Sequence, residues 1–406
     1  MRIIHVSDCY LPRLGGIEVQ VADLVRTQRA AGHDAEVVTA TPGEPLPGVH
    51  RIVANLPFDL PVHPTGTGHL LRLMAARRPD VVHVHTGAVS PFAWMGVRAA
   101  ARAGLPTVVT VHSMWDPVTR GIYRSLRALY GWQRWGLVGT AVSEAAARPI
   151  RAVAGPGVPV HVVSNGLDLS AWRPEAPAVR PAPSGSSESA PASVSEGGPA
   201  SVSEGGPEGG QGGGAGARSA GGAVHVVAVG RLAPRKQPVR LLRLLKQARA
   251  QVPAGVPLRA TIVGDGPARA QMERYLRSNG MTGWVALPGR YSRERIRELL
   301  ASADVFVAPA PRESFGLAAL EARAAGVPVV ARTESGVADF VRPGKEGLLG
   351  GSFEELVSAV ARLARDRELR ESIAAHNRGT EPVRSSWPAV LEGFDRCYEQ
   401  ARELRG

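Results

Sequence analysis

One segment near the middle of the chain cannot contribute to a folded core, and it divides the 406 residues into two parts. From Pro177 to Gly222 the residues are almost all Pro, Gly, Ser, Ala and Glu, and the octapeptide ASVSEGGP occurs twice in tandem. Such a stretch buries too little apolar surface to offset the entropy lost when a chain becomes ordered. We therefore expect a disordered linker over 176–222, between two parts that are each large enough to form a domain.

Both parts alternate short apolar runs with longer amphipathic segments, the pattern of a buried parallel sheet covered by helices. In the first part we predict strands at 2–7, 35–39, 81–85, 107–111, 137–142 and 160–164. In the second part we predict strands at 224–229, 259–263, 285–287, 305–308 and 327–331. Helices are expected between them, among others at 18–31, 238–251, 268–278, 293–301 and 317–325. The predicted fold class is α/β, with two Rossmann-like doubly wound domains facing across a cleft.

Composition excludes several classes of protein. The two cysteines, Cys9 and Cys397, are too few for a disulfide framework or a four-cysteine zinc site. No apolar run is long enough to cross a membrane or to serve as a signal peptide, so we expect a cytoplasmic protein. The net charge of +12 favours anionic partners, but nearly all the basic residues are Arg, a bias that genome composition also produces.

Glycines and basic residues follow the first predicted strand of each part. Ligands of doubly wound sheets bind beyond the carboxyl ends of the strands, where the next helix presents free N–H groups to an anion. Gly15 and Gly16 occupy this position in the first part, and Gly230, Arg231 and Lys236 occupy it in the second. A guanidinium and an ammonium that converge there suit a diphosphate. The alternatives are an ordinary strand-to-helix turn and a solvated basic loop.

The motif ESFGLAALE carries two acids around the start of a predicted helix. Glu313 precedes the helix, and the backbone N–H groups of Phe315, Gly316 and Leu317 are placed to bind phosphate. Glu321 follows Glu313 by eight residues, which corresponds to roughly 12 Å along a helix. That separation suits an elongated ligand with hydroxyls at both ends and a diphosphate between them. Taken singly, each acid is also explained as a helix-surface or dipole-stabilising carboxylate.

Polar residues follow other predicted strands as well. Gly264 belongs to a Gly-Asp-Gly-Pro sequence that lacks the third glycine of a dinucleotide fingerprint, so we interpret it as a turn near a ligand. His112 follows one strand, and we expect His83 and His85 to point into the cleft from the end of another. The histidine spacing matches no standard metal motif, and no Asp-x-Asp is present to hold a metal diphosphate. We therefore expect no metal site.

The segment 122–135 is rich in aromatic residues and arginine. We favour a helix that packs its aromatic side chains inside the domain. The alternative is a peripheral contact with an anionic membrane surface, at the inner face of the membrane.

Taken in order, these motifs resemble those of the retaining glycosyltransferases of family 4, which have the GT-B fold. The resemblance also includes Ala-Val-Ser-Glu at 141–144 and Ser-Asn-Gly-Leu-Asp at 164–168, and it covers nearly the whole chain outside the linker. It implies an acceptor-side domain at 1–175 and a domain at 223–385 that binds the nucleotide sugar. The C-terminal helix within 386–406 would return to complete the first domain.

The resemblance implies transfer of a hexose from a UDP- or GDP-sugar to a hydroxyl acceptor, with retention of configuration and with no metal or other cofactor. Arg231 and Lys236 would bind the donor diphosphate and stabilise the departing nucleotide. Glu313 would contact the hydroxyls of the donor sugar, Glu321 would bind the ribose, and His112 would lie near the anomeric carbon. The other expected donor contacts are Gly15, Gly16, Gly230, Gly264, Phe315, Gly316 and Leu317.

Several alternatives stay open at this point. The same fold serves nucleotide-sugar epimerases and hydrolases, and the positive charge alone is consistent with a non-catalytic protein that binds polyanions. A nucleic-acid partner is not expected. The sequence does not specify the donor base, the sugar or the acceptor, which is a sugar, a lipid or a small metabolite.

Overall fold

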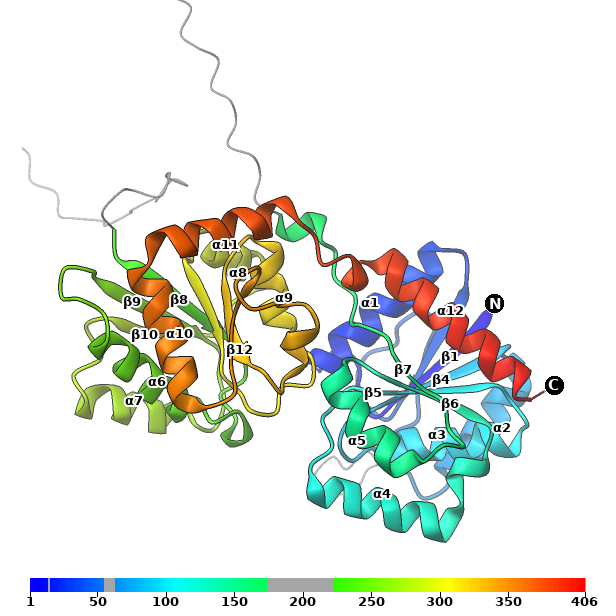
Figure 1. The fold of residues 1–406 in the computed structure, drawn as a ribbon. Coiled ribbons are helices and arrows are strands. Elements are labelled where there is room, and N and C mark those ends of the chain that lie inside the picture. The colour runs from blue at the N-terminus through cyan, green and yellow to red at the C-terminus, as the bar shows by residue number, and fades with distance from the viewer. Residues whose placement is uncertain (14, 55–62, 174–221, 406) are drawn as a thin grey trace, which may run out of the picture. The chain divides into compact units, whose positions relative to one another are not determined.

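The computed structural model describes residues 1–13, 15–54, 63–173 and 222–405. The predicted linker at 176–222 lies outside the described residues, apart from Gly222. The described residues form two parallel sheets with helices packed against them (Figure 1).

The first sheet has seven strands among the described residues, in the order β3-β2-β1-β4-β5-β6-β7. All neighbouring pairs are parallel. The strands are β1 (Arg2–Ser7), β2 (Asp34–Thr39), β3 (Val49–Arg51), β4 (Val81–Thr86), β5 (Thr107–Val111), β6 (Leu137–Ala141) and β7 (Val160–Val162). The helices between them are α1 (Gly16–Ala30), α2 (Gly66–Arg77), α3 (Pro91–Arg102), α4 (Pro117–Tyr130) and α5 (Glu144–Ala154).

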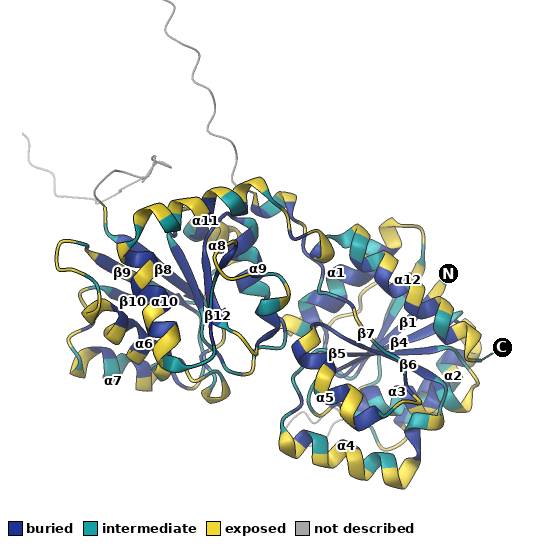
Figure 2. Ribbon diagram, viewed as in Figure 1, coloured by how far each residue is buried: buried dark blue, intermediate teal, exposed yellow. Residues whose placement is uncertain are grey.

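The second sheet has six strands in the described part of the chain, in the order β10-β9-β8-β11-β12-β13, again all parallel. Its strands are β8 (Val224–Val229), β9 (Leu258–Val263), β10 (Val285–Gly289), β11 (Val305–Ala308), β12 (Val329–Arg332) and β13 (Gly347–Gly350). Its helices are α6 (Pro238–Ala250), α7 (Arg269–Ser278), α8 (Arg293–Ala301), α9 (Leu317–Ala324), α10 (Phe353–Arg365) and α11 (Arg367–Gly379). Figure 2 shows the central strands of both sheets as mostly buried and the outer helix faces as exposed.

The structure confirms the predicted α/β class with two doubly wound sheets. Each predicted strand is present, with ends that coincide with the prediction or differ from it by one or two residues. The prediction missed β3 and β13, which are edge strands of three and four residues. Both are too short to show a periodic pattern, and β13 contains two glycines that lower its strand propensity.

The last helix, α12 (Trp387–Glu403), packs against the first sheet rather than the second. Val390, Phe394 and Tyr398 join a core cluster with side chains from β1, β4, β5 and β6. Tyr398 is fully buried and accepts a hydrogen bond from Gln28 of α1 at 2.8 Å. A segment at the far end of the sequence thus completes the core of the first sheet.

Truncating the apolar face of α12 should destabilise the fold. We predict that Phe394→Ala lowers the free energy of unfolding by about 3 to 4 kcal/mol, because it removes a buried ring and leaves a cavity. Urea denaturation of the full chain measures this change. Leu404→Ala, next to the end of the same helix at 48% exposure, should cost less than about 0.5 kcal/mol. Equal losses in the two variants would contradict the packing described for α12.

Candidate functional site

Two loops at the carboxyl end of the second sheet bring predicted residues into contact. Lys236 ends a short turn after β8, and Glu313 lies in the loop between β11 and α9. The Lys236 ammonium donates a hydrogen bond to Oε2 of Glu313 at 2.5 Å, and both side chains are partly exposed. An ammonium held in this way presents its remaining N–H groups to an anion. The structure therefore unites Lys236 and Glu313 in one site.

The start of α9 adds backbone donors to this site. Gly316 is the N-cap of α9, and its φ of +93° lies in the left-handed region that favours glycine. A Cβ atom at Gly316 would lie 2.6 Å from a methyl group of Val337. Phe315 is buried and packs on Phe340, so its side chain anchors the loop while the N–H groups from Leu317 onward begin the helix. The side chain of Phe315, in a residue that is 3% exposed, is not available to a ligand.

Glu321 lies on α9, about one turn after Leu317, and is half-buried. Burial raises the pKa of its carboxyl to about 7, and the positive charge of Arg293 opposes the rise only in part. Near neutral pH this side chain is thus a mixture of carboxylic acid and carboxylate. A protonated carboxyl both donates and accepts hydrogen bonds, as a diol requires.

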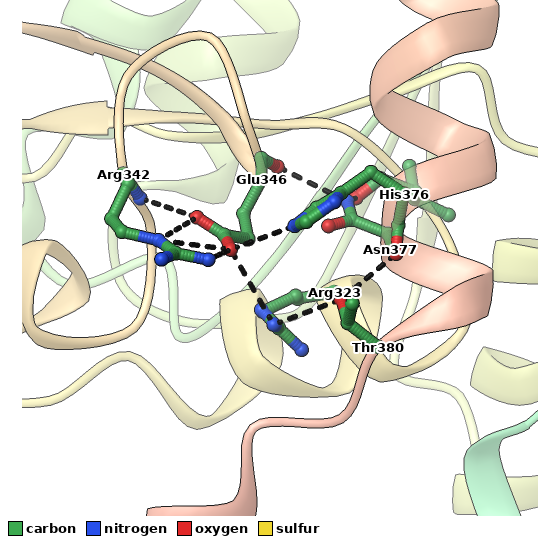
Figure 3. A network of polar contacts seen from close by, with 7 residues as sticks. Arg323, Arg342, Glu346, His376, Asn377 and Thr380 are labelled. Atoms are coloured by element: carbon green, nitrogen blue, oxygen red, sulfur yellow. Dashed lines mark hydrogen bonds and ion pairs between the residues drawn. The ribbon is translucent and has the colours of Figure 1, made fainter.

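A buried carboxylate fixes α9 to its neighbours, as Figure 3 shows. Glu346, at 1% exposure, forms ion pairs with Arg342 and with Arg323 of α9 at 3.7 Å, and its Oε1 accepts a hydrogen bond from Nε2 of His376 of α11 at 3.0 Å. Burial acts to raise the pKa of Glu346, but hydrogen bonds from Arg342 and His376 outweigh it and bring the pKa to about 2. The side chain of Asn377 also donates to the Glu346 carbonyl oxygen. Since Arg323 follows Glu321 by two residues, this network fixes the helix that carries Glu321.

The two glycines at the ends of β8 and β9 contact each other. Gly264 has a φ of +143°, and a Cβ atom there would lie 1.9 Å from the carbonyl oxygen of Gly230. Backbone packing between the loops therefore requires Gly264, whereas Gly230 faces open space. Arg231 follows Gly230 and is exposed, near the turn that carries Lys236.

The glycine pair of the first sheet marks the start of α1. Gly15 is the N-cap, and Gly16 is the first helical residue. A Cβ atom at Gly15 would lie 2.3 Å from the carboxylate of Glu18, which is buried and forms an ion pair with Arg13 at 3.1 Å. The space at Gly15 is thus taken by a neighbouring side chain.

His112 follows β5 directly, as predicted, but His83 and His85 do not project from a strand end. Both lie within β4 and are 0% and 2% exposed. The prediction was wrong because β4 extends to Thr86 and its alternate side chains face α12. His112 does contact His85, whose Nδ1 lies 3.1 Å from Nε2 of His112.

Sequence reasoning missed Asp8, the first residue after β1. It is buried, and its Oδ1 accepts hydrogen bonds from the backbone N–H groups of Phe92 at 2.8 Å and Ala93 at 3.3 Å. Its Oδ2 has no partner among the described residues. Burial raises the pKa of the carboxyl to about 6. The sequence feature that could have identified Asp8 is its position as an acid immediately after a predicted buried strand, at the same sheet edge as His112.

Two family models match separate parts of the chain. The model described as Glycosyltransferase Family 4 matches residues 14–171, and the model described as Glycosyl transferases group 1 matches residues 218–380. The first match covers the first sheet and the second covers the second sheet.

Two relatives and one solved structure are similar to this chain over nearly its full length. A GDP-mannose-dependent alpha-mannosyltransferase of Mycobacterium tuberculosis is 29% identical over 100% of this chain and 98% of its own length. A D-inositol 3-phosphate glycosyltransferase of Rhodococcus erythropolis is also 29% identical, over 95% of this chain and 83% of its own length. The crystal structure of Anabaena Alr3699/HepE in complex with UDP is similar in fold, with a TM-score of 0.70, 19% identity and 98% and 99% of the two chains covered.

The raised pKa of Glu321 predicts a specific pH dependence. Since burial disfavours the charged form, the folded state loses stability as pH rises from the ordinary carboxyl pKa of 4.5 to about 7. We expect the free energy of unfolding to fall by about 1 to 2 kcal/mol more between pH 5 and pH 8 in the unaltered protein than in Glu321→Gln. Chemical denaturation at the two pH values measures the difference. The same pH dependence in both proteins would refute the assignment.

Proposed function

Because the chain belongs to the family 4 glycosyltransferases of the GT-B fold, we propose that it transfers a hexose from a nucleotide-diphosphate sugar to a hydroxyl acceptor, with retention and without a metal ion. The observation that supports this proposal best is the Lys236–Glu313 pair at the carboxyl end of β8 and β11. The pair places a cation for phosphate beside an acceptor group for hydroxyls, next to the N-terminus of α9.

The diphosphate would bind Lys236, the exposed Arg231 and the N–H groups at the start of α9. Negative charge develops on the diphosphate as the glycosidic bond breaks, and these donors stabilise it. The charge of the side chains substitutes for a metal in this scheme. The rate should therefore be unchanged in a chelator, and a loss of activity in EDTA that Mg²⁺ restores would refute metal independence.

The hydroxyl-bearing parts of the donor would bind the carboxyls. Oε1 of Glu313 has no hydrogen-bond partner among the described residues, so it remains for hexose hydroxyls, while Glu321 binds the ribose. On the first sheet, His112 would lie near the anomeric carbon, at the same sheet edge as the buried Asp8. Retention then results from departure and attack on the same face of the sugar, which placement and charge favour.

Relatives suggest which donors to test first. The Mycobacterium tuberculosis protein is named for GDP-mannose, and the Anabaena structure contains UDP. We propose GDP-mannose as the first candidate donor and UDP-glucose as the comparison. A ligand at 100 times its dissociation constant stabilises a protein by about 2.7 kcal/mol, which a thermal shift without metal detects.

Removal of either member of the ion pair should abolish transfer. We predict that Lys236→Ala and Glu313→Ala each lower the rate of transfer from the stabilising donor at least about 100-fold, because each removes a contact to the transition state. The matched control is Lys246→Ala, since Lys246 is exposed on α6 and contacts Asn279 instead. Thermal melts establish that the variants are folded. A full rate in either site variant would refute its role, and release of free hexose without an acceptor would identify a hydrolase.

Helix α4 has one face in the core and one exposed face. Tyr123 is buried and stacks on Trp115 at 4.1 Å between ring centroids, and Trp132 just beyond α4 is also buried. The prediction that aromatic residues of this segment pack inside is confirmed for Tyr123 and Trp132 and is wrong for Tyr130, which is 55% exposed at the end of α4. Val118 and Leu129, however, are 72% and 76% exposed.

We propose that this exposed face contacts an anionic membrane surface. Val118, Ile122 and Leu129 follow one another at helical spacing, and α4 contains three arginines and no acidic residue. No helix in the described ranges has both the length and the apolar character to span a bilayer, so the proposal concerns a peripheral contact. Apolar side chains would enter the interface while the guanidinium group of Arg124, which is exposed, meets lipid phosphates.

Charged substitutions on this face should weaken membrane binding. We predict that Val118→Glu with Leu129→Glu reduces sedimentation with vesicles of 30% anionic lipid by at least about ten-fold. Vesicles of neutral lipid should bind the unaltered protein weakly. Val383→Glu, at a residue 64% exposed outside α4, is the matched control and should bind normally. Equal binding by all three proteins would refute the contact.

A further inference from the structure

A chain of buried side chains joins α1 to His112 through the core of the first sheet. Oε1 of Gln28 lies 2.7 Å from Nε2 of His5, and Nδ1 of His5 lies 2.9 Å from Nε2 of His85. Nδ1 of His85 then lies 3.1 Å from Nε2 of His112. Gln28, His5 and His85 are each no more than 2% exposed. The contacts run from α1 through β1 and β4 to the residue after β5 without interruption.

Each imidazole in this chain is neutral near pH 7. Burial lowers the pKa of His5 and of His112 to about 4, and it lowers that of His85 well below the ordinary value. A neutral imidazole has one nitrogen that donates and one that accepts. The orientation of one member therefore determines the proton position on every other member.

Gln28 supplies that orientation. Its amide NH₂ donates to Oη of Tyr398 at 2.8 Å, so its carbonyl oxygen faces His5. Tyr398 also lies 2.8 Å from Nδ1 of His83, and its single O–H satisfies that contact. Nε2 of His5 must then carry the proton that it donates to Gln28, which leaves Nδ1 of His5 as an acceptor. Nε2 of His85 must therefore be protonated, because it faces Nδ1 of His5. By the same reasoning Nε2 of His112, which faces Nδ1 of His85, is protonated. Nδ1 of His112 is left unprotonated and has no hydrogen-bond partner in the described ranges.

The same histidines also have the geometry of a metal site, since ring nitrogens of His5, His83 and His85 lie within 4.8 Å of one another. All six of their ring nitrogens, however, have hydrogen-bond partners at 2.7 to 3.1 Å. The hydrogen-bond chain accounts for the cluster without an ion.

We propose that Gln28, His5 and His85 are positioning residues that hold His112 with its proton on Nε2, so that its Nδ1 accepts a hydrogen bond from a ligand. The inference rests on the proposed function only in taking that ligand to be a hexose hydroxyl of the donor. An unprotonated imidazole nitrogen accepts a hydrogen bond from a hydroxyl group. It is repelled by a phosphate oxygen, which has no proton to donate. The chain would thereby direct the neutral sugar, and not the diphosphate, toward His112.

The experiment measures the proton position directly, in the full chain labelled with ¹⁵N-histidine and without substrate. The NMR signals of His112 are identified by their loss in His112→Asn. We expect a protonated Nε2 and an unprotonated Nδ1 in the unaltered protein. In Gln28→Met we expect a mixture of the two tautomers and a kcat about ten-fold lower, with the KM for the donor changed much less.

Thr140→Val is the matched control. Thr140 is fully buried, and its hydroxyl lies 2.5 Å from that of Thr110, which bonds His83 on the side branch. The variant loses a buried hydrogen bond but leaves the path from Gln28 to His112 intact. Its melting temperature should fall about as far as that of Gln28→Met, while the His112 tautomer and kcat stay unchanged.

Two results would overturn the proposal: a proton on Nδ1 of His112 in the unaltered protein, or unchanged His112 signals in Gln28→Met. If Gln28→Met does not fold, Tyr398→Phe removes the group that orients the Gln28 amide and should give the same mixture of tautomers. The tautomer is measured without substrate. A result that overturns the tautomer proposal is therefore distinct from one that overturns the proposed function. A protein with the expected tautomer that transfers no hexose would refute only the latter.

Discussion

The packing of α12 on the first sheet is the interaction on which most of that domain depends. A parallel sheet must be covered on both faces, and here part of the cover comes from the opposite end of the chain. Phe394 and Tyr398 close over strands that carry His5, His83 and His85. The three rings are buried, and burial lowers the pKa of His5 to about 4 and those of His83 and His85 well below the ordinary value. The covering helix thus converts a row of polar residues into a set of neutral hydrogen-bonded groups.

In the second domain the main structural constraint is different: a short helix must be held in place at the carboxyl edge of the sheet. Helix α9 has only eight residues and little helical stability of its own. Its position is fixed at the start by the buried ring of Phe315 and near its end by Arg323, which meets the buried Glu346. The residues between these anchors include Leu317 and Glu321. The rigidity that binding requires therefore comes from contacts behind the helix.

Local pattern was sufficient to predict every described strand except β3 and β13, and to place Lys236, Glu313 and Gly316 at one edge of the second sheet. These features depend on the order of residues near a strand end, which the sequence displays directly. The burial of His83 and His85 was not predictable in this way, because it depends on which face α12 covers more than 300 residues later in the chain. Asp8 was missed for a related reason, since its partners Phe92 and Ala93 belong to a helix that only the folded sheet brings near. Gly264 was predicted to adjoin a ligand, whereas its contact with Gly230 is already a requirement of backbone packing.

The two sheet edges differ in charge, and the difference matches the two ends of the proposed donor. At the second sheet, Lys236 and Arg231 provide full positive charges close to free helix N–H groups. At the first sheet, burial keeps His112 neutral, and Asp8, whose pKa burial raises to about 6, is mostly a carboxylate near pH 7. A nucleotide sugar carries all its charge on the diphosphate and none on the hexose. A cationic edge would favour the diphosphate, whereas a carboxylate and a neutral imidazole would favour hydroxyl groups, so the two edges would discriminate between the two ends of the proposed donor.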